Sequence, residues 1–420
     1  MSGIQRQTSI YLSGVSGRRP KVPIDAARLE AEAEQLMSEE AHAYVAAGAG
    51  NESTIRANRA AFERRRIVPR MLRDVSERDT AVTLFGRRLP APFLTAPIGV
   101  LELAHRDADL AVARAARDEG VPMIFSNQAS KPMEECAEAL GDSPRWFQLY
   151  WSSSDELVES LVARAEACGC EAIVLTVDTM MAGWRPRDLE PAFLPFLRGK
   201  GIAQYTSDPV FRRLMKEGAS EGPGGTPRPN LSALSTLIQL TRAYPGGFLR
   251  SLTSGDARAA VERFVQIYSR PSLDWDQLSF LRERTQLPIV LKGVLHPDDA
   301  ARAIDSGLDG IVVSNHGGRQ VDGAIATLDA LPAVVQAVGG RVPVLLDSGI
   351  RGGADAFKAL ALGATAVLIG RPYVYGLAIA GEAGVREVLR NFKADFDLTM
   401  GLAGRNSVGE IDRDTIVPAP

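Results

Sequence analysis

The sequence predicts an α/β protein built on a closed (β/α)8 barrel, the TIM-barrel architecture. From residue 92 onward, eight short runs rich in Val, Ile, Leu and Phe alternate with segments whose apolar residues recur at helical spacing. The runs are continuously apolar, which indicates strands buried on both faces, and eight such strands favour a barrel over an open sheet. The runs cover residues 92–99, 122–128, 145–151, 172–178, 288–293, 310–318, 343–349 and 366–372.

We expect the chain to form a single domain over residues 1–420, in which additional segments flank or interrupt the barrel. Residues 1–91 form a helical N-terminal extension, residues 92–390 the barrel and residues 391–420 a C-terminal tail. A long excursion at about 182–272 follows the fourth strand and includes the Gly- and Pro-rich stretch EGPGGTPRPN. We interpret it as a structureless insertion that acts as a lid over the site, and we call it the lid insertion.

The N-terminal extension is expected to hold two helices and a hairpin. The second helix follows Asn51, and residues 80–90 are expected to form a hairpin that plugs the bottom of the barrel. The first helix carries an apolar stripe made of Leu29, Leu36, Met37, Tyr44 and Val45.

Composition excludes several kinds of partner. The formal net charge of -3 is nearly neutral, and no Lys and Arg cluster alternates with aromatic residues, so we expect no nucleic-acid partner. The first residues lack the apolar core of a signal peptide, and no segment reaches the roughly 18 apolar residues of a membrane helix, so we expect a cytoplasmic protein without membrane contact. Cys136, Cys168 and Cys170 are too few for a disulfide framework, and we expect no metal site.

Polar or glycine residues stand where each predicted strand leaves the core. In a (β/α)8 barrel the carboxyl ends of the strands meet at one rim, and active sites lie there. Eight strands that aim such residues at one rim therefore predict a binding site. The residues are Gly99, Ser126, Gln148, Tyr150, Thr176, Asp178, Lys292, Ser314, His316, Asp347, Gly370 and Arg371.

The last two strands carry a phosphate-binding pattern. LDSGIRGG at 346–353 opens one helix and IGRP at 369–372 precedes another, so both offer backbone N–H groups and guanidinium donors. Barrels commonly bind phosphate at this place. The glycines of the first motif alone could be turn residues, but the two motifs together predict a phosphate-bearing ligand.

His316 and Lys292 are the candidate reactive side chains. His316 ends a strand within the motif SNHGGRQ. In the same motif, the guanidinium of Arg319 could bind a carboxylate through two hydrogen bonds. Asp178, at a nearby strand end, could orient the imidazole of His316. Lys292 is either a Schiff-base amine or a cation that stabilises negative charge. From the residues alone, a Schiff-base aldolase with a phosphate-bearing substrate stays open beside an enzyme with a phosphate-bearing cofactor.

At these motifs the sequence resembles the FMN-dependent α-hydroxy acid dehydrogenases and oxidases. The resemblance covers roughly residues 25–410, and its collinear motifs include FQLYW, LTVDT, LPIVLKGV, SNHGGRQVDG and LDSGIRGGADAFKALALGATAVLIGRP. It implies FMN as the cofactor, a small L-2-hydroxy acid and O2 as partners, and a homo-oligomer, either a tetramer or an octamer.

The resemblance also implies roles for individual residues. His316 is the base, Asp178 its partner, Tyr150 a hydrogen-bonding group at the substrate oxygen and Lys292 a cation near the flavin N1 and C2 carbonyl. Alignment on the motif TVDT places the substrate-binding arginine at Arg185 rather than Arg187. The implied substrate contacts are Tyr44, Tyr150, Arg185, His316 and Arg319. The implied cofactor contacts are Pro97, Ile98, Gly99, Ser126, Gln148, Thr176, Lys292, Ser314, Asp347, Ser348, Gly349, Ile350, Arg351, Gly370 and Arg371.

Within the family, APIGV at 96–100 and the stretch at 183–211 are most similar to the lactate 2-monooxygenases. This implies conversion of L-lactate and O2 to acetate, CO2 and water. Gly99, which lacks a Cβ, is expected to open space beside the flavin where keto acid and peroxide could meet. An oxidase that releases keto acid and H2O2, a quinone-coupled lactate dehydrogenase and a flavin-binding scaffold stay open as alternatives.

Overall fold

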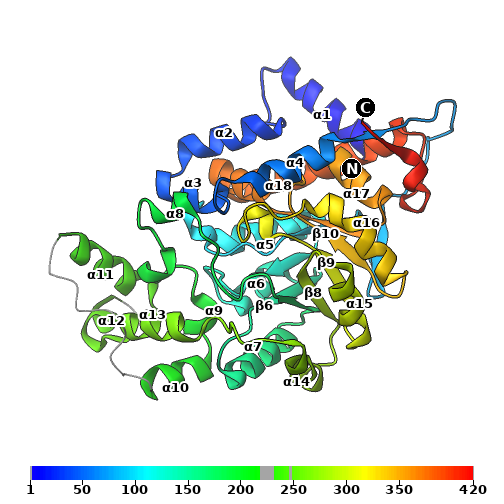
Figure 1. Cartoon of the computed structure of the whole chain (residues 1–420). Helices are drawn as coiled ribbons and strands as arrows, with labels where there is room; N and C mark the ends of the chain where they lie inside the picture. The colour runs from blue at the N-terminus through cyan, green and yellow to red at the C-terminus, as the bar shows by residue number, and fades with distance from the viewer. Residues whose placement is uncertain (1, 218–230, 246–247, 420) are drawn as a thin grey trace.

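The computed structural model of the protein describes residues 2–217, 231–245 and 248–419. At its centre is a closed barrel of eight strands surrounded by helices (Figure 1), which confirms the predicted fold. The strands are β4 (Phe93–Thr95), β5 (Met123–Phe125), β6 (Arg145–Leu149), β7 (Ile173–Thr176), β8 (Ile289–Val294), β9 (Gly310–Val313), β10 (Val344–Leu346) and β11 (Ala366–Ile369). Each pairs in parallel with its sequence neighbours, and β11 closes the barrel onto β4.

Both faces of the barrel strands are buried, which explains why the apolar runs are continuous. Leu94, Val174 and Val312 belong to one cluster inside the barrel. Their neighbours along the strands, such as Phe93 and Ile173, belong to the larger core between the strands and the helices. Polar side chains therefore gather where the strands end.

A hairpin closes the amino end of the barrel, as predicted. Strands β2 (Val82–Leu84) and β3 (Arg87–Leu89) pair antiparallel. Leu84 and Leu89 are buried in the same cluster as the barrel interior, and the Phe85 ring lies 5.5 Å from the Trp146 ring. Because this end is filled, a ligand can enter the barrel only from the carboxyl ends of the strands.

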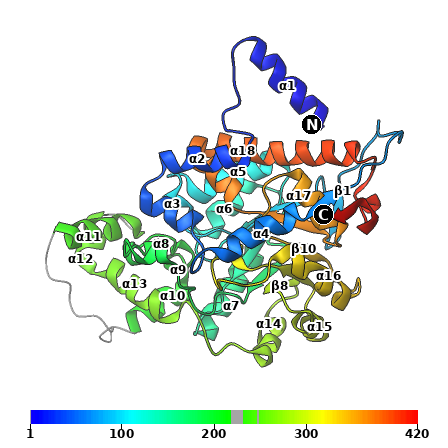
Figure 2. The same cartoon turned by 45° about the horizontal axis from the view of Figure 1, so that its top comes forward.

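The described part of the N-terminal extension contains four helices: α1 (Gly3–Val15), α2 (Ala26–Leu36), α3 (Glu39–Ala46) and α4 (Ser53–Glu63). The prediction of one helix across the apolar stripe is wrong, because Ser38 caps α3 by accepting from the Ala41 N–H and so starts a new helix. Leu36 is consequently 59% exposed, whereas Tyr44 is buried. Helix α1 stands out from the body of the molecule (Figure 2).

The barrel is surrounded by helices that follow its strands. They are α5 (Ala108–Glu119), α6 (Met133–Leu140), α7 (Asp155–Ala167), α14 (Leu278–Arg284), α15 (Pro297–Asp305), α16 (Thr327–Val338), α17 (Gly353–Ala361) and α18 (Arg371–Leu402). Helix α18 continues past the predicted boundary at residue 391, so the tail begins only after Leu402. The tail returns to the N-terminal extension, where β12 (Ile416–Pro418) pairs with β1 (Arg65–Ile67). In the part of the chain that the structure describes, none of the helices has the length and apolar character needed to span a membrane.

The lid insertion is helical, which corrects the prediction of a structureless segment. It contains α8 (Pro186–Leu189), α9 (Ala203–Thr206), α10 (Pro209–Glu217), α11 (Leu231–Ala243), α12 (Phe248–Ser254) and α13 (Asp256–Ile267). Helix α13 buries an apolar face that includes Val261 and Phe264, and its packing against α10, α11 and α12 of the same insertion stabilises it. The stretch EGPGGTPRPN at 221–230 lies outside the described residues.

Candidate active site

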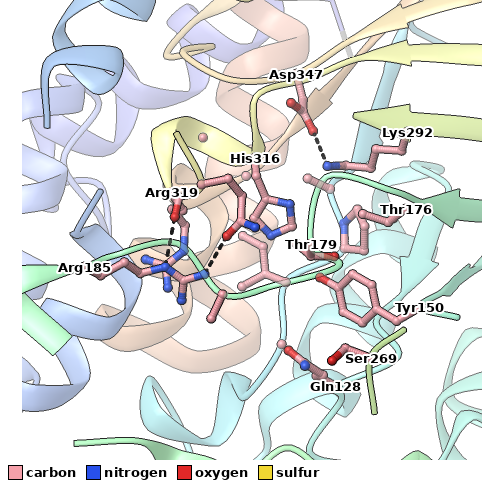
Figure 3. Close-up of a pocket in the computed structure, with 18 of the residues that line it drawn as sticks. Gln128, Tyr150, Thr176, Thr179, Arg185, Ser269, Lys292, His316, Arg319 and Asp347 are labelled. Atoms are coloured by element: carbon pink, nitrogen blue, oxygen red, sulfur yellow. Dashed lines mark hydrogen bonds and ion pairs between the residues drawn. The ribbon is translucent and has the colours of Figure 1, made fainter. Parts of the chain in front are cut away.

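A cavity at the carboxyl ends of the barrel strands gathers most of the predicted site residues (Figure 3). The predicted residues that line it are Tyr44, Pro97, Ile98, Gly99, Tyr150, Thr176, Arg185, Lys292, His316, Arg319, Asp347, Ser348, Gly349, Ile350, Arg351, Gly370 and Arg371. Each of the other four forms a hydrogen bond with a residue that lines the cavity; they are Ser126, Gln148, Asp178 and Ser314. Ser126 also donates to Gln148. The sequence therefore placed residues from eight strand ends at one site.

Asp178 orients the imidazole of His316, and burial keeps that imidazole neutral. Its Nδ1 lies 2.9 Å from Asp178 Oδ1, and because a carboxylate can only accept, Nδ1–H is the donor. Burial lowers the pKa of His316, and the opposing effect of Asp178 does not restore it. The imidazole is thus neutral at ordinary pH, with Nε2 left to accept a proton.

The backbone around His316 and Asp178 lets these two residues lie close together. His316 has a φ of 57°, an uncommon left-handed conformation for a non-glycine residue, and its N–H donates to Ser314 Oγ at 3.1 Å. Gly293 in β8 has a φ of 110°, and a Cβ there would lie 2.7 Å from Asp178 Cβ. Gly293 therefore makes room for Asp178, a role that a glycine inside an apolar strand can signal in sequence.

Lys292 is a buried cation. Its Nζ lies 3.2 Å from Asp347 Oδ2 and donates to Ser314 Oγ at 3.0 Å. Burial opposes the charge, but the carboxylates of Asp347 and Asp178 outweigh it and raise the pKa of Lys292. A Schiff-base lysine needs a free amine with a lowered pKa, so this geometry favours the cation over the aldolase interpretation.

Arg185, Arg319 and Tyr44 form a group that we call the carboxylate clamp. Arg185 Nε donates to the Arg319 carbonyl at 3.0 Å, and Arg319 Nη1 donates to the Ala47 carbonyl at 2.8 Å. The Arg319 guanidinium carbon lies 5.2 Å from the centre of the Tyr44 ring. Burial, together with the charge of Arg185, lowers the pKa of Arg319 to about 9, so an anion placed here would be stabilised.

Arg187 does not join the carboxylate clamp. Its side chain is 42% exposed and its Nη1 lies 3.4 Å from Glu52 Oε1. The geometry therefore agrees with the alignment that selects Arg185.

Tyr150 and Thr176 line one wall of the cavity, and a chain of polar side chains supports Thr176 from behind. Ser126 Oγ donates to Gln148 Oε1 at 3.1 Å, and Gln148 Nε2 donates to Thr176 Oγ1 at 3.2 Å. Burial, with a smaller effect of Asp178, raises the pKa of Tyr150 to about 12. Its phenol therefore stays protonated and can donate a hydrogen bond.

The residues of the phosphate motifs fit a bound phosphate group. Arg351 lines the cavity and is partly buried, and burial together with the neighbouring Arg371 lowers its pKa, so an anion bound beside this guanidinium would be stabilised. Gly370 precedes the first turn of α18, and a Cβ there would have its nearest contact at 3.8 Å, which leaves space beside the helix N-terminus. Arg371 itself donates to three backbone carbonyls, of Val45, Gly317 and Ala47, and so also ties α3 to the 316–318 turn.

Sequence reasoning missed the part of the cavity that the loops and the lid insertion supply. Gln320 donates to the Asp178 and Met181 carbonyls at 2.6 and 2.8 Å, and Arg185 Nη2 donates to its Oε1 at 2.9 Å. Its position next to Arg319 in SNHGGRQ was a usable signal. The other missed lining residues are Val45, Ala96, Gln128, Trp151, Thr179, Met180, Met181, Ala182, Leu194, Phe196, Phe264, Val265, Tyr268, Ser269, Arg270, Leu273, Gly317 and Leu368.

Comparison with known proteins identifies the family. The model of the FMN-dependent dehydrogenase family matches residues 33–418. An L-lactate oxidase of Lysinibacillus sphaericus is 41% identical over 97% of this chain and 96% of its own, and human 2-hydroxyacid oxidase 1 is 39% identical over 93% and 95%. A crystal structure of mandelate oxidase is similar over 95% of this chain and 99% of its own, with a TM-score of 0.75 and 37% identity. The chain belongs to the FMN-dependent dehydrogenase family and, within it, to the FMN-dependent oxidoreductases of 2-hydroxy acids.

Proposed function

We propose that this protein is an L-lactate 2-monooxygenase, which converts L-lactate and O2 to acetate, CO2 and water. The observation that carries this proposal is that the lid insertion supplies Phe196, Phe264 and Tyr268 to the cavity that holds His316. These side chains enclose the space in which a keto acid would form. An enclosed keto acid that leaves slowly can react with peroxide before release.

FMN would be held by the residues of the barrel rim. Arg351, Gly370 and the N-terminus of α18 would bind its phosphate, and the chain from Ser126 to Thr176 would face the ring edge. Lys292 would place its positive charge near the ring. FMN, when bound, supplies the acceptor for two electrons and passes them to oxygen.

The other polar residues would bind and deprotonate the substrate. The carboxylate clamp holds the carboxylate through charge-assisted hydrogen bonds from Arg185 and Arg319. Tyr150 hydrogen-bonds the 2-oxygen, and His316 Nε2 takes the proton while Asp178 stabilises the imidazolium.

The contact between Gly99 and Gln128 corrects our expectation that Gly99 leaves an open space. A Cβ at Gly99 would lie 2.9 Å from Gln128 Cβ and 3.0 Å from the Gln128 carbonyl oxygen. Gln128 thus fills the place that we expected to be empty, and its carbonyl also accepts from the Val100 N–H at 2.9 Å. The missing Cβ lets Gln128 approach the cavity and helps to enclose it.

A second candidate is an oxidase that releases keto acid and H2O2, since the relatives at 41% and 39% identity are named as oxidases. Both candidates share the substrate, the base and the cofactor. They differ in whether the keto acid and peroxide leave the cavity or react there according to pyruvate + H2O2 → acetate + CO2 + H2O. Analysis of the products therefore separates them.

Aerobic turnover of L-lactate by the FMN-loaded protein should give mainly acetate, with little free pyruvate or peroxide. Gly99→Ala should displace Gln128 and raise the ratio of pyruvate to acetate by about tenfold, because small displacements at a reaction site change rates strongly. Gly14→Ala is the control, since nothing lies within 4 Å of a Cβ there. Chromatographic quantification of both acids checks the prediction. Stoichiometric pyruvate and peroxide from the unmodified protein would instead identify a simple oxidase.

A further inference from the structure

A carboxylate of the lid insertion stands beside the two arginines of the carboxylate clamp. Asp188, in α8, has its Oδ2 3.5 Å from Arg185 Nη1 and 3.8 Å from Arg319 Nη2. All three side chains are nearly buried, between 13% and 15% exposed. Asp188 is therefore the protein's own carboxylate at the place where both arginines are expected to meet the carboxylate of a substrate.

The arginines do not depend on Asp188 for their positions. Both distances exceed the range of a direct N–H···O hydrogen bond. The close hydrogen bonds of Arg185 run to the Arg319 carbonyl and Gln320 Oε1, and that of Arg319 runs to the Ala47 carbonyl. Asp188 consequently acts on the clamp through its charge rather than through its geometry.

The hydrogen-bonding capacity of Asp188 is incompletely used. Its Oδ1 is buried and has no hydrogen-bond partner among the described residues. Burial raises the pKa of Asp188, and the two arginines do not offset this effect. A carboxylate held in this way is poorly solvated and interacts strongly with any second anion nearby.

We propose that Asp188 is an internal competitor for the carboxylate clamp, a residue that sets affinity through its charge and weakens the binding of the 2-hydroxy acid and of its keto acid product. The identity of these ligands rests on the function proposed above. Two guanidinium groups and one carboxylate give the clamp a net charge of about +1, enough to neutralise a single monoanionic acid. Repulsion between Asp188 and the bound acid then speeds release of the keto acid.

The test measures binding without turnover. FMN-loaded protein is titrated anaerobically with pyruvate and with pyruvamide, its uncharged analogue, while the flavin absorbance is followed. Asp188→Asn should lower the Kd of pyruvate by about tenfold, the scale of a like-charge repulsion over a few ångströms, and leave the Kd of pyruvamide unchanged. In aerobic turnover the same variant should raise the fraction of acetate.

Control variants separate charge from structure. Glu190→Gln removes a charge from an exposed position two residues further along and should leave both Kd values unchanged. Asp188→Glu retains the charge and should not tighten pyruvate binding. Asp188→Ser offers a second neutral replacement if the amide disturbs folding, and it should also tighten pyruvate binding.

Weaker or unchanged pyruvate binding in both neutral variants would overturn the inference and make Asp188 a structural partner of the arginines. An equal change for pyruvate and pyruvamide would overturn it too, because a charge effect requires a charged ligand. The outcome is independent of the product: if the unmodified protein releases pyruvate and peroxide, the monooxygenase proposal fails while selective tightening in Asp188→Asn still supports the inference.

Discussion

Replacing His316 with alanine should slow the reduction of bound FMN by L-lactate by about 10²-fold or more, the usual effect of removing a general base. Nε2 is the free proton acceptor of the imidazole because Nδ1 faces Asp178 at 2.9 Å. FMN should stay bound, since the phosphate motifs lie on β10, β11 and the helices that follow them. Anaerobic stopped-flow absorbance measures the rate directly.

His105→Ala is the matched control for this prediction. His105 packs against Gly381, where a Cβ would lie 3.0 Å from its Nε2, and it is not among the residues that line the cavity. Its replacement should leave flavin reduction unchanged. Near-normal reduction in His316→Ala would mean that another group accepts the proton.

Replacing Lys292 with methionine should lower the free energy of unfolding by about 3–5 kcal/mol, because it leaves Asp347 charged and buried without its cation. Both side chains of the pair are almost fully buried, at 4% and 8% exposure, so solvent screens the loss little. The same change should also slow flavin reduction, since it removes the positive charge expected near the ring. Urea unfolding of the FMN-free protein measures the first effect.

The double variant Lys292→Met, Asp347→Asn distinguishes the two effects. Removing the unpaired carboxylate should restore much of the stability but not the rate of flavin reduction. If the single variant unfolds at the same urea concentration as the unmodified protein, the Lys292–Asp347 ion pair does not have the energetic role assigned to it here.

The barrel could be predicted from sequence because one physical constraint determines each strand. A strand buried on both faces has to be apolar along its length, so polar residues such as Gln148, Lys292 and Ser314 stand out at its carboxyl end. Closure of the barrel then brings these residues together at one rim, so the position of the site follows from the predicted fold. The residues of the phosphate motifs were predictable for the same reason.

Most of the parts that sequence reasoning missed depend on packing between distant segments. The break between α2 and α3 is an exception, because it depends on the local cap at Ser38, which interrupts an otherwise continuous apolar spacing. Phe196, Phe264 and Tyr268 reach the cavity only because the helices of the lid insertion pack over the barrel. The contact of Gly99 with Gln128 joins the loops after two adjacent strands, so a missing Cβ was mistaken for empty space.

The central claim is that this protein oxidises a 2-hydroxy acid at the carboxyl ends of its barrel strands, with FMN as the cofactor and His316 as the base. Anaerobic addition of L-lactate to the FMN-loaded protein tests this claim most directly. The account predicts that the absorbance of oxidised flavin disappears with L-lactate, returns when oxygen is admitted, and disappears about 10²-fold more slowly in His316→Ala. Protein that binds FMN but keeps its full absorbance with L-lactate and other small 2-hydroxy acids would contradict the account.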